Sequence, residues 1–226
     1  MIAPVWHLAI TVSIFVAVFA LPLAFRSHQP NHPKPISPSA GLFAAALVLY
    51  GLFAGWVLWG LKLRGTPVLR IIGRTWKSFE DVTRDLLIGI GALAVTLLGD
   101  FLFMQFGHFY HGRMTVLAKT PTQLTFELAA FFAAGVVEEL IFRGYLMRQF
   151  DNFIGTPWIT NAMQASLFAM AHGADQTLIG FMSKFFGAIL LGWIAKRTDS
   201  LLPGMATHVM LDVGVGLVIW LVRHGA

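Results

Sequence analysis

The sequence predicts an all-α membrane protein, a polytopic helical bundle of about seven transmembrane segments. Apolar residues make up 57% of the 226 positions and charged residues only 12%, about half of their usual share. Mostly apolar windows of roughly eighteen or more residues, long enough to cross a bilayer as helices, recur along the whole length. We find no soluble domain and no internal repeat, so we expect one bundle in contact with membrane lipid.

The charge balance also fits a membrane protein. The formal net charge is +5, from 16 Lys and Arg against 11 Asp and Glu. In a soluble protein this excess would suggest nucleic acid, but here the basic residues gather in loops between apolar segments, where they orient helices in the membrane. We therefore expect no nucleic-acid partner. The chain has no cysteine, which excludes disulfides, thiolate metal sites and a cysteine nucleophile.

The first half of the chain, 1–122, is expected to hold three spans and two connecting segments. The predicted spans cover about 5–25, 41–61 and 85–106. The proline-rich stretch 26–40 cannot be helical and should form an extended connector. The basic stretch 62–84 should include an amphipathic surface helix over 68–82.

Two short motifs in this half are weak signals. Gly51 and Gly55 have GxxxG spacing, which permits close approach of another helix. Asp100 follows Gly99, as in the GxGD motif of aspartyl intramembrane proteases, but Leu97 stands where that motif needs a glycine. We do not expect an aspartyl protease.

The second half, 123–226, is expected to form the catalytic helical core. Its spans are predicted at about 123–150, 157–172, 177–195 and 201–222. The segment 157–172 is short for a full crossing, so it should begin deep in the membrane or be strongly tilted if its C-terminal end is to reach the other motifs.

The basic loops predict the orientation of the bundle. If the loop 62–84 is cytoplasmic, the N-terminus lies on the same side, together with Arg148, Lys196 and Arg197. We expect a multi-pass protein of the plasma membrane with a cytoplasmic N-terminus.

The chemistry is expected to centre on the stretch FFAAGVVEELIFRGYLM, in which Glu138 and Glu139 are adjacent. A charged side chain at the centre of a membrane helix costs roughly 2.5–3.5 kcal/mol unless it is paired or needed for function. Glu139 and Arg143 are i and i+4 and should form a pair. Glu138 points about 100° away and has no partner in its own helix, so it is a candidate general base.

Two more motifs place polar groups in apolar segments. Phe168 and His172 are i and i+4, and so are His208 and Asp212. Together with Glu138, the histidines and the aspartate can satisfy one another around a water-filled cavity inside the bundle.

Missing motifs narrow the mechanism. The chain has no GxSxG and no HExxH, which argues against serine hydrolases and zincin metalloproteases. Glutamate and histidine can activate a water without a covalent intermediate. Glu138, His172 and His208 also form a His₂Glu set of the kind that holds a catalytic zinc, so zinc is a candidate cofactor. Spacing does not separate the metal-free from the zinc mechanism.

The three motifs, taken in order, resemble those of the CPBP (CAAX-processing and bacteriocin-processing, or Abi) family of intramembrane proteases. The family patterns EExxxR, FxxxH and HxxxN or HxxxD are matched within about 130–216 by Glu138-Glu139-xxx-Arg143, Phe168-xxx-His172 and His208-xxx-Asp212.

The resemblance implies a role for each matched position. Glu138 and His172 would activate water, and His208 and Asp212 would line the oxyanion side of the site. The pair Glu139 and Arg143, with Phe168, would support the structure. CAAX enzymes of this family have Asn at the position of Asp212.

The leading hypothesis is an intramembrane endopeptidase, of the glutamate-dependent or the metalloprotease type, that hydrolyses a peptide bond of a membrane-associated or lipidated protein. A non-catalytic membrane protein of the same fold, such as a peptide-binding scaffold or an immunity protein, is the alternative. A transporter is a third reading, but it predicts inverted repeats, which we do not find.

Overall fold

The computed structural model describes residues 1–20, 39–107, 117–172 and 177–224, and these residues form helices and no strand. The expected connector 26–40 lies almost entirely outside these ranges. The helices are α1 (Val5–Phe15), the π-helix η1 (Val16–Ala20), α3 (Ala40–Lys62), α4 (Val68–Ile72), α5 (Phe79–Met104), α6 (Pro121–Glu139), the π-helix η3 (Leu140–Met147), α7 (Arg148–Ile154), α8 (Pro157–Ala171), α9 (Leu178–Thr198) and α10 (Leu202–His224).

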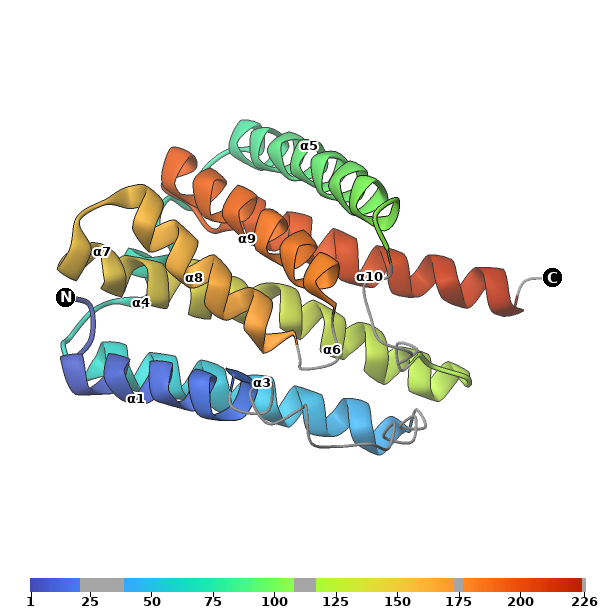
Figure 1. Cartoon of the computed structure of the whole chain (residues 1–226), viewed down its shortest axis with the longest axis horizontal. Helices are drawn as coiled ribbons and strands as arrows, with labels where there is room; N and C mark the ends of the chain where they lie inside the picture. Colours follow the sequence, from blue (N-terminus) through green and yellow to red (C-terminus); the bar gives the residue numbers. More distant parts are fainter. Residues whose placement is uncertain (21–38, 108–116, 173–176, 225–226) are drawn as a thin grey trace.

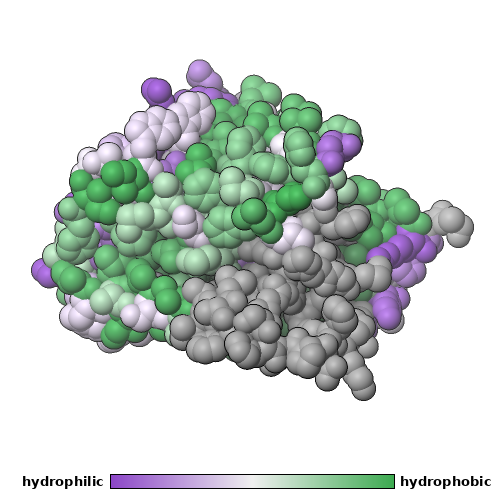
Figure 2. Space-filling model, in the orientation of Figure 1, coloured by the Kyte–Doolittle hydropathy of each residue, from purple (hydrophilic) through white to green (hydrophobic). Residues whose placement is uncertain are grey.

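The protein is an all-α membrane bundle, as predicted. Within the described residues, four helices are long and apolar enough to cross a membrane: α3, α5, α9 and α10. Only 11% of the most apolar window of α3 is buried inside the protein, so most of that window faces outward. Figure 2 shows apolar residues over much of the visible face, as expected of a surface solvated by lipid. The count of seven spans stays a prediction, because α1, α6 and α8 do not meet the same criteria.

The helices lie roughly side by side, and α6 runs through the middle of the bundle (Figure 1). It packs against α3 on one side and against α10 on the other. Helix α8 packs against α9, and α5 covers α9 and α10. The central position of α6 brings its polar residues into contact with helices from both halves of the chain.

The chain is helical without a break from Pro121 to Ile154, somewhat further than the predicted 123–150. The Thr120 hydroxyl accepts a hydrogen bond from the backbone N–H of Gln123, and Pro121 occupies the first turn. The helix ends at Gly155, whose φ of +66° favours glycine. Its middle section, η3, is a π-helix whose residues from Ile141 to Met147 are all buried. Such irregular turns occur often at functional sites.

The short fifth segment is confirmed as α8, which starts at Pro157 and ends at Ala171. Its polar side chains hold it against α9. The side-chain amide of Asn161 donates to the carbonyl of Ile189, and that of Gln164 donates to the carbonyl of Ala188. His172 follows directly as the C-terminal cap, so the packing of α8 on α9 sets the position of this histidine.

The predicted surface helix over 68–82 is wrong. Helix α4 covers five residues and stops at Gly73, where φ is +79° and the backbone pairs with Ser200. The Ser78 hydroxyl then accepts a hydrogen bond from the backbone N–H of Asp81, which starts α5 at Phe79, six residues earlier than predicted.

The basic segments meet at one end of the bundle. The N-terminal amine of Met1 donates to the side chain of Asn152, which follows η3. The backbone N–H of Leu201, which follows the basic last turn of α9, donates to the carbonyl of Ile72 in α4. The structure therefore brings these segments to one end of the bundle, and the placement of that end on the cytoplasmic side of the membrane stays a prediction.

Candidate active site

The predicted pair of Glu139 and Arg143 forms, and both side chains are fully buried. Arg143 Nη1 donates to Glu139 Oε1 at 2.8 Å, and Arg143 Nη2 donates to the Ala188 carbonyl at 3.1 Å. The guanidinium also lies over the Phe168 ring, 4.7 Å from its centroid. Removing one member of a buried ion pair costs about 3–5 kcal/mol, because the other charge is left unpaired. This pair therefore joins α6, η3, α8 and α9 into one unit.

His208 of α10 is held among three carboxylates. Its Nδ1 lies 3.1 Å from Glu139 Oε1, so Nδ1 carries the proton and donates to that acceptor. Its Nε2 faces Glu138 Oε2 at 3.8 Å and Asp212 Oδ2 at 3.6 Å. The predicted juxtaposition of His208 with Asp212 and Glu138 is thus present in the structure, and Glu139 orients the ring.

Glu138 uses its two oxygens differently. Oε1 accepts a hydrogen bond of 2.9 Å from the hydroxyl of Tyr50 on α3. Oε2 is buried and has no hydrogen-bond partner among the described residues. A buried oxygen without a partner is costly, and such positions normally hold water or receive a ligand.

One ring nitrogen of His172, Nε2, makes no hydrogen bond with the described residues. Its Nδ1 lies 2.8 Å from the backbone carbonyl of Phe168, so Nδ1 must donate, and in the neutral ring Nε2 keeps its lone pair. The Phe168 ring centroid lies 4.4 Å from that of His172 and 5.8 Å from that of His208. Phe168 therefore contacts both histidines.

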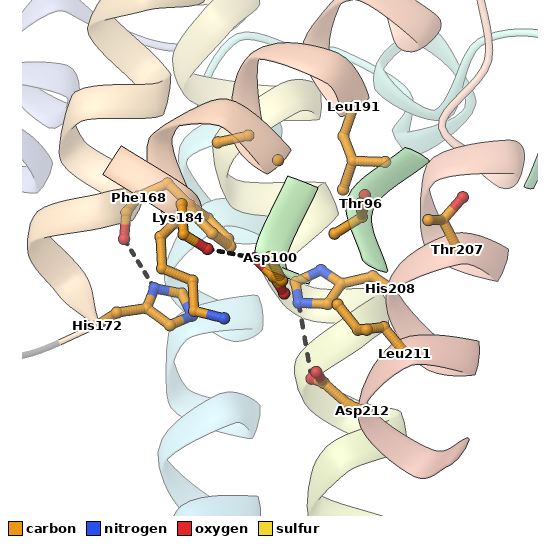
Figure 3. A pocket seen from close by; sticks show the side chains of 13 residues that line it. Thr96, Asp100, Phe168, His172, Lys184, Leu191, Thr207, His208, Leu211 and Asp212 are labelled. Carbon is orange, nitrogen blue, oxygen red and sulfur yellow. Dashed lines mark hydrogen bonds and ion pairs between the residues drawn. The ribbon is translucent and has the colours of Figure 1, made fainter. Parts of the chain in front are cut away.

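Both histidines line one cavity of about 50 Å³ (Figure 3). A water molecule needs roughly 10–15 Å³ on this measure, so the cavity has room for a few waters. Asp212, Asp100 and Lys184 also line it. Glu138 is not among the lining residues and is linked to the cavity through its contact with His208.

The match to a known protein family covers this site. Residues 120–214 match the family model described as type II CAAX prenyl endopeptidase, Rce1-like. The match covers less than half of the chain, and the residues before Thr120 lie outside it. The predicted resemblance to CPBP intramembrane proteases is therefore confirmed, and the match indicates a protease. Searches of curated proteins and of solved structures give no match.

All seven site residues predicted from the sequence lie within the Rce1-like segment: Glu138, Glu139, Arg143, Phe168, His172, His208 and Asp212. The structure joins six of them by direct contacts around His208 and Arg143. His172 is joined to the others through Phe168 and the shared cavity.

The zinc set proposed from the sequence is not assembled in the described part of the chain. A zinc ion would be bound by the atoms that make no hydrogen bond within the described residues, namely Glu138 Oε2, His172 Nε2 and His208 Nε2. However, no three Asp, Glu, His or Cys side chains among the described residues are grouped as metal ligands. The zinc alternative stays a prediction, and the mechanism proposed below is written for the side chains of the protein alone.

Sequence reasoning missed two residues at the site, Tyr50 and Lys184. Tyr50 comes from the first half of the chain, outside the Rce1-like segment, and carried no motif. Lys184 had a usable signal, because a lysine within an apolar span is by default a functional candidate. Asp100, rejected as an aspartyl-protease residue, lines the same cavity and accepts a hydrogen bond from Ser183.

Proposed function

We propose that the protein is an intramembrane endopeptidase that hydrolyses a peptide bond of a membrane-associated or lipidated protein. The observation that carries the proposal is the unpartnered Oε2 of Glu138, which lies 3.8 Å from His208 Nε2 inside a segment of a membrane-protease family. A buried carboxylate oxygen of this kind can hold and polarise a water.

In the proposed reaction, a water bound to Glu138 Oε2 attacks the scissile carbonyl, and Glu138 together with His172 takes its proton. His172 suits this role because its Nε2 lone pair is free while Nδ1 donates to Phe168. The same proton is then delivered to the leaving amine as the carbon–nitrogen bond breaks. Glu139 keeps His208 in place through Nδ1.

The substrate of this reaction is expected to reach the site through the membrane. The cavity lies within the bundle and holds only a few waters as it stands, so the substrate must approach from the bilayer or one of its surfaces. We place the basic end of the bundle in the cytoplasm and the protein in the plasma membrane, on the strength of the positive-inside rule.

The test compares membranes of cells that produce the wild type with membranes of cells that produce Glu138→Gln, using mass spectrometry of protein termini. The wild type should generate new termini in membrane proteins, and Glu138→Gln should not, because an amide cannot accept the water proton. Glu80→Gln is the matched control, since Glu80 is exposed in the first turn of α5. Equal cleavage by Glu138→Gln, or no wild-type cleavage at equal protein levels, would favour the non-catalytic scaffold.

A further inference from the structure

Lys184 is a partly buried cation that has no role in the proposed reaction as described so far. It lies in α9, one of the four helices able to span a membrane, and it lines the cavity. Within the described part of the chain, Lys184 makes no hydrogen bond and no ion pair with another side chain. A lysine held in an apolar helix costs roughly 2.5–3.5 kcal/mol, so an unpaired one calls for a functional reason.

The side chain of Lys184 lies in the same cavity as His172 and Asp212. It is close enough to His172 and to Asp212 to interact with both electrostatically. Figure 3 shows its side chain passing His172 and extending into the cavity that His208 and Asp212 also line.

Most of the other polar groups at the cavity cannot donate to the reacting carbonyl, or already donate elsewhere. Attack on a carbonyl creates an oxyanion, which needs hydrogen-bond donors or a positive charge beside it. The carboxylate of Asp212 can only accept, and His208 Nε2 already faces two carboxylates. The hydroxyls of Ser183 and Thr207 donate to Asp100 and to backbone carbonyls.

We propose that Lys184 is a catalytic residue that binds the oxyanion of the scissile carbonyl. As the water oxygen bonds to the carbonyl carbon, the π electrons move onto the carbonyl oxygen, and the ammonium donates a hydrogen bond to it. The ammonium keeps its protons throughout, and the water proton goes to Glu138 and His172 as described above. Asp212 holds the ammonium in place electrostatically before the substrate arrives. The inference rests on the proposed peptidase function.

Kinetics in lipid nanodiscs test this assignment, with a membrane peptide whose cleavage requires Glu138 as substrate. Lys184→Met should lower kcat by about 100- to 1,000-fold with little change in KM, as expected for the loss of an oxyanion donor. Lys184→Arg, which keeps a charged donor, should retain more activity than Lys184→Met. Lys77→Met, at an exposed position on the basic end of the bundle, should leave kcat unchanged.

A second substitution separates catalysis from structure. Adding Asp212→Asn to Lys184→Met places an amide donor at the cavity and removes a negative charge, so it should restore part of the lost kcat. Thermal unfolding in detergent checks each variant, and Lys184→Gln replaces Lys184→Met if the latter does not fold.

Three results would overturn the role of Lys184: an unchanged kcat, a loss confined to KM, or Lys184→Arg being no better than Lys184→Met. If the wild type cleaves and Glu138→Gln does not, any of these refutes the role of Lys184 alone. If the wild type does not cleave any peptide, the peptidase function itself fails.

Discussion

The hydroxyl of Tyr50 settles which oxygen of Glu138 is free to react. It donates to Oε1 at 2.9 Å, and Oε2 is left facing His208 without a hydrogen bond. Tyr50 lies on α3, outside the Rce1-like segment, so the first half of the chain contributes directly to the site. A base held by a fixed donor is pre-organised, which lowers the cost of reaching the reactive geometry.

Replacing Tyr50 by Phe should therefore lower kcat without unfolding the protein. A hydrogen bond to a charged group is worth about 1.5–3 kcal/mol, which corresponds to a loss of about 10- to 150-fold. Steady-state kinetics in nanodiscs would measure it. Tyr145→Phe is a matched control, because Tyr145 bonds to His7 at 2.6 Å and not to Glu138. It should lower the thermal stability and leave kcat intact, whereas full activity of Tyr50→Phe would show that Glu138 needs no such donor.

Residue pairs close in sequence were predictable, and pairs from different helices were not. The i, i+4 spacing alone predicts the ion pair of Glu139 with Arg143, because helix geometry fixes that contact. The bond from Tyr50 to Glu138 depends on which helix lies beside α6, and a single sequence does not contain that information. The same holds for the placement of Lys184 beside His172.

At the scale of elements, the close approach of α10 to α6 brings His208 to the glutamates. Gly135 makes this possible. A Cβ at position 135 would lie 2.7 Å from a side-chain carbon of Val209 and 2.8 Å from its backbone nitrogen. Val209 follows His208 directly, so any shift of α10 at this point moves the histidine.

Gly135→Ala should reduce activity and stability together. The added methyl group meets backbone, which cannot rotate away, so α10 must move outward and His208 Nε2 moves away from Glu138. Peptidase kinetics and thermal unfolding of the same preparation would measure both effects. Gly55→Ala is the control, because a Cβ there meets nothing within 4 Å and alanine favours a helix by ~0.5–1 kcal/mol. Wild-type activity of Gly135→Ala would show that the α6–α10 spacing tolerates change.

The apolar pattern predicted most helices to within a few residues, since length and hydropathy define them. It failed where single residues override the pattern. Gly73 ends α4 and Ser78 starts α5, so the stretch 68–82 is not one helix. The GxxxG pair marks no close contact in the described part of the chain, because a Cβ at Gly51 or Gly55 would meet nothing within 4 Å there. Glycines that do form a helix contact, such as Gly135, stand outside that spacing pattern.

At the scale of the whole molecule, the fold class could be predicted from composition. With 57% apolar and 12% charged residues, the chain has too few charged side chains to cover a surface in water, so its helices are expected to face lipid. It was also predictable that the basic segments and the N-terminus lie close together. The N-terminus, α4 and the end of α9 meet at one end of the bundle, where Figure 1 shows α4, α7 and the N-terminus together. The number of spans stays a prediction, because α6 carries several polar residues and α8 has only 15 residues.

Single-cysteine labelling would test this topology, because the chain has no cysteine of its own. Arg64→Cys and Arg197→Cys, exposed at the basic end, should react with an impermeant maleimide only in inside-out vesicles. Lys119→Cys, exposed just before the N-terminus of α6, should react in intact cells. Labelling of Arg64→Cys and Lys119→Cys from the same side would contradict the arrangement.

The most direct test of hydrolysis at the Glu138 site is oxygen-isotope incorporation in H₂¹⁸O. The purified protein in nanodiscs would be incubated with a cleavable membrane peptide. Mass spectrometry would then measure the mass of the product that carries the new C-terminus. We expect one ¹⁸O atom in the new carboxylate with the wild type, and no product with Glu138→Gln folded to the same extent. Product formed at the wild-type rate by Glu138→Gln, or no product from the folded wild type, would contradict it.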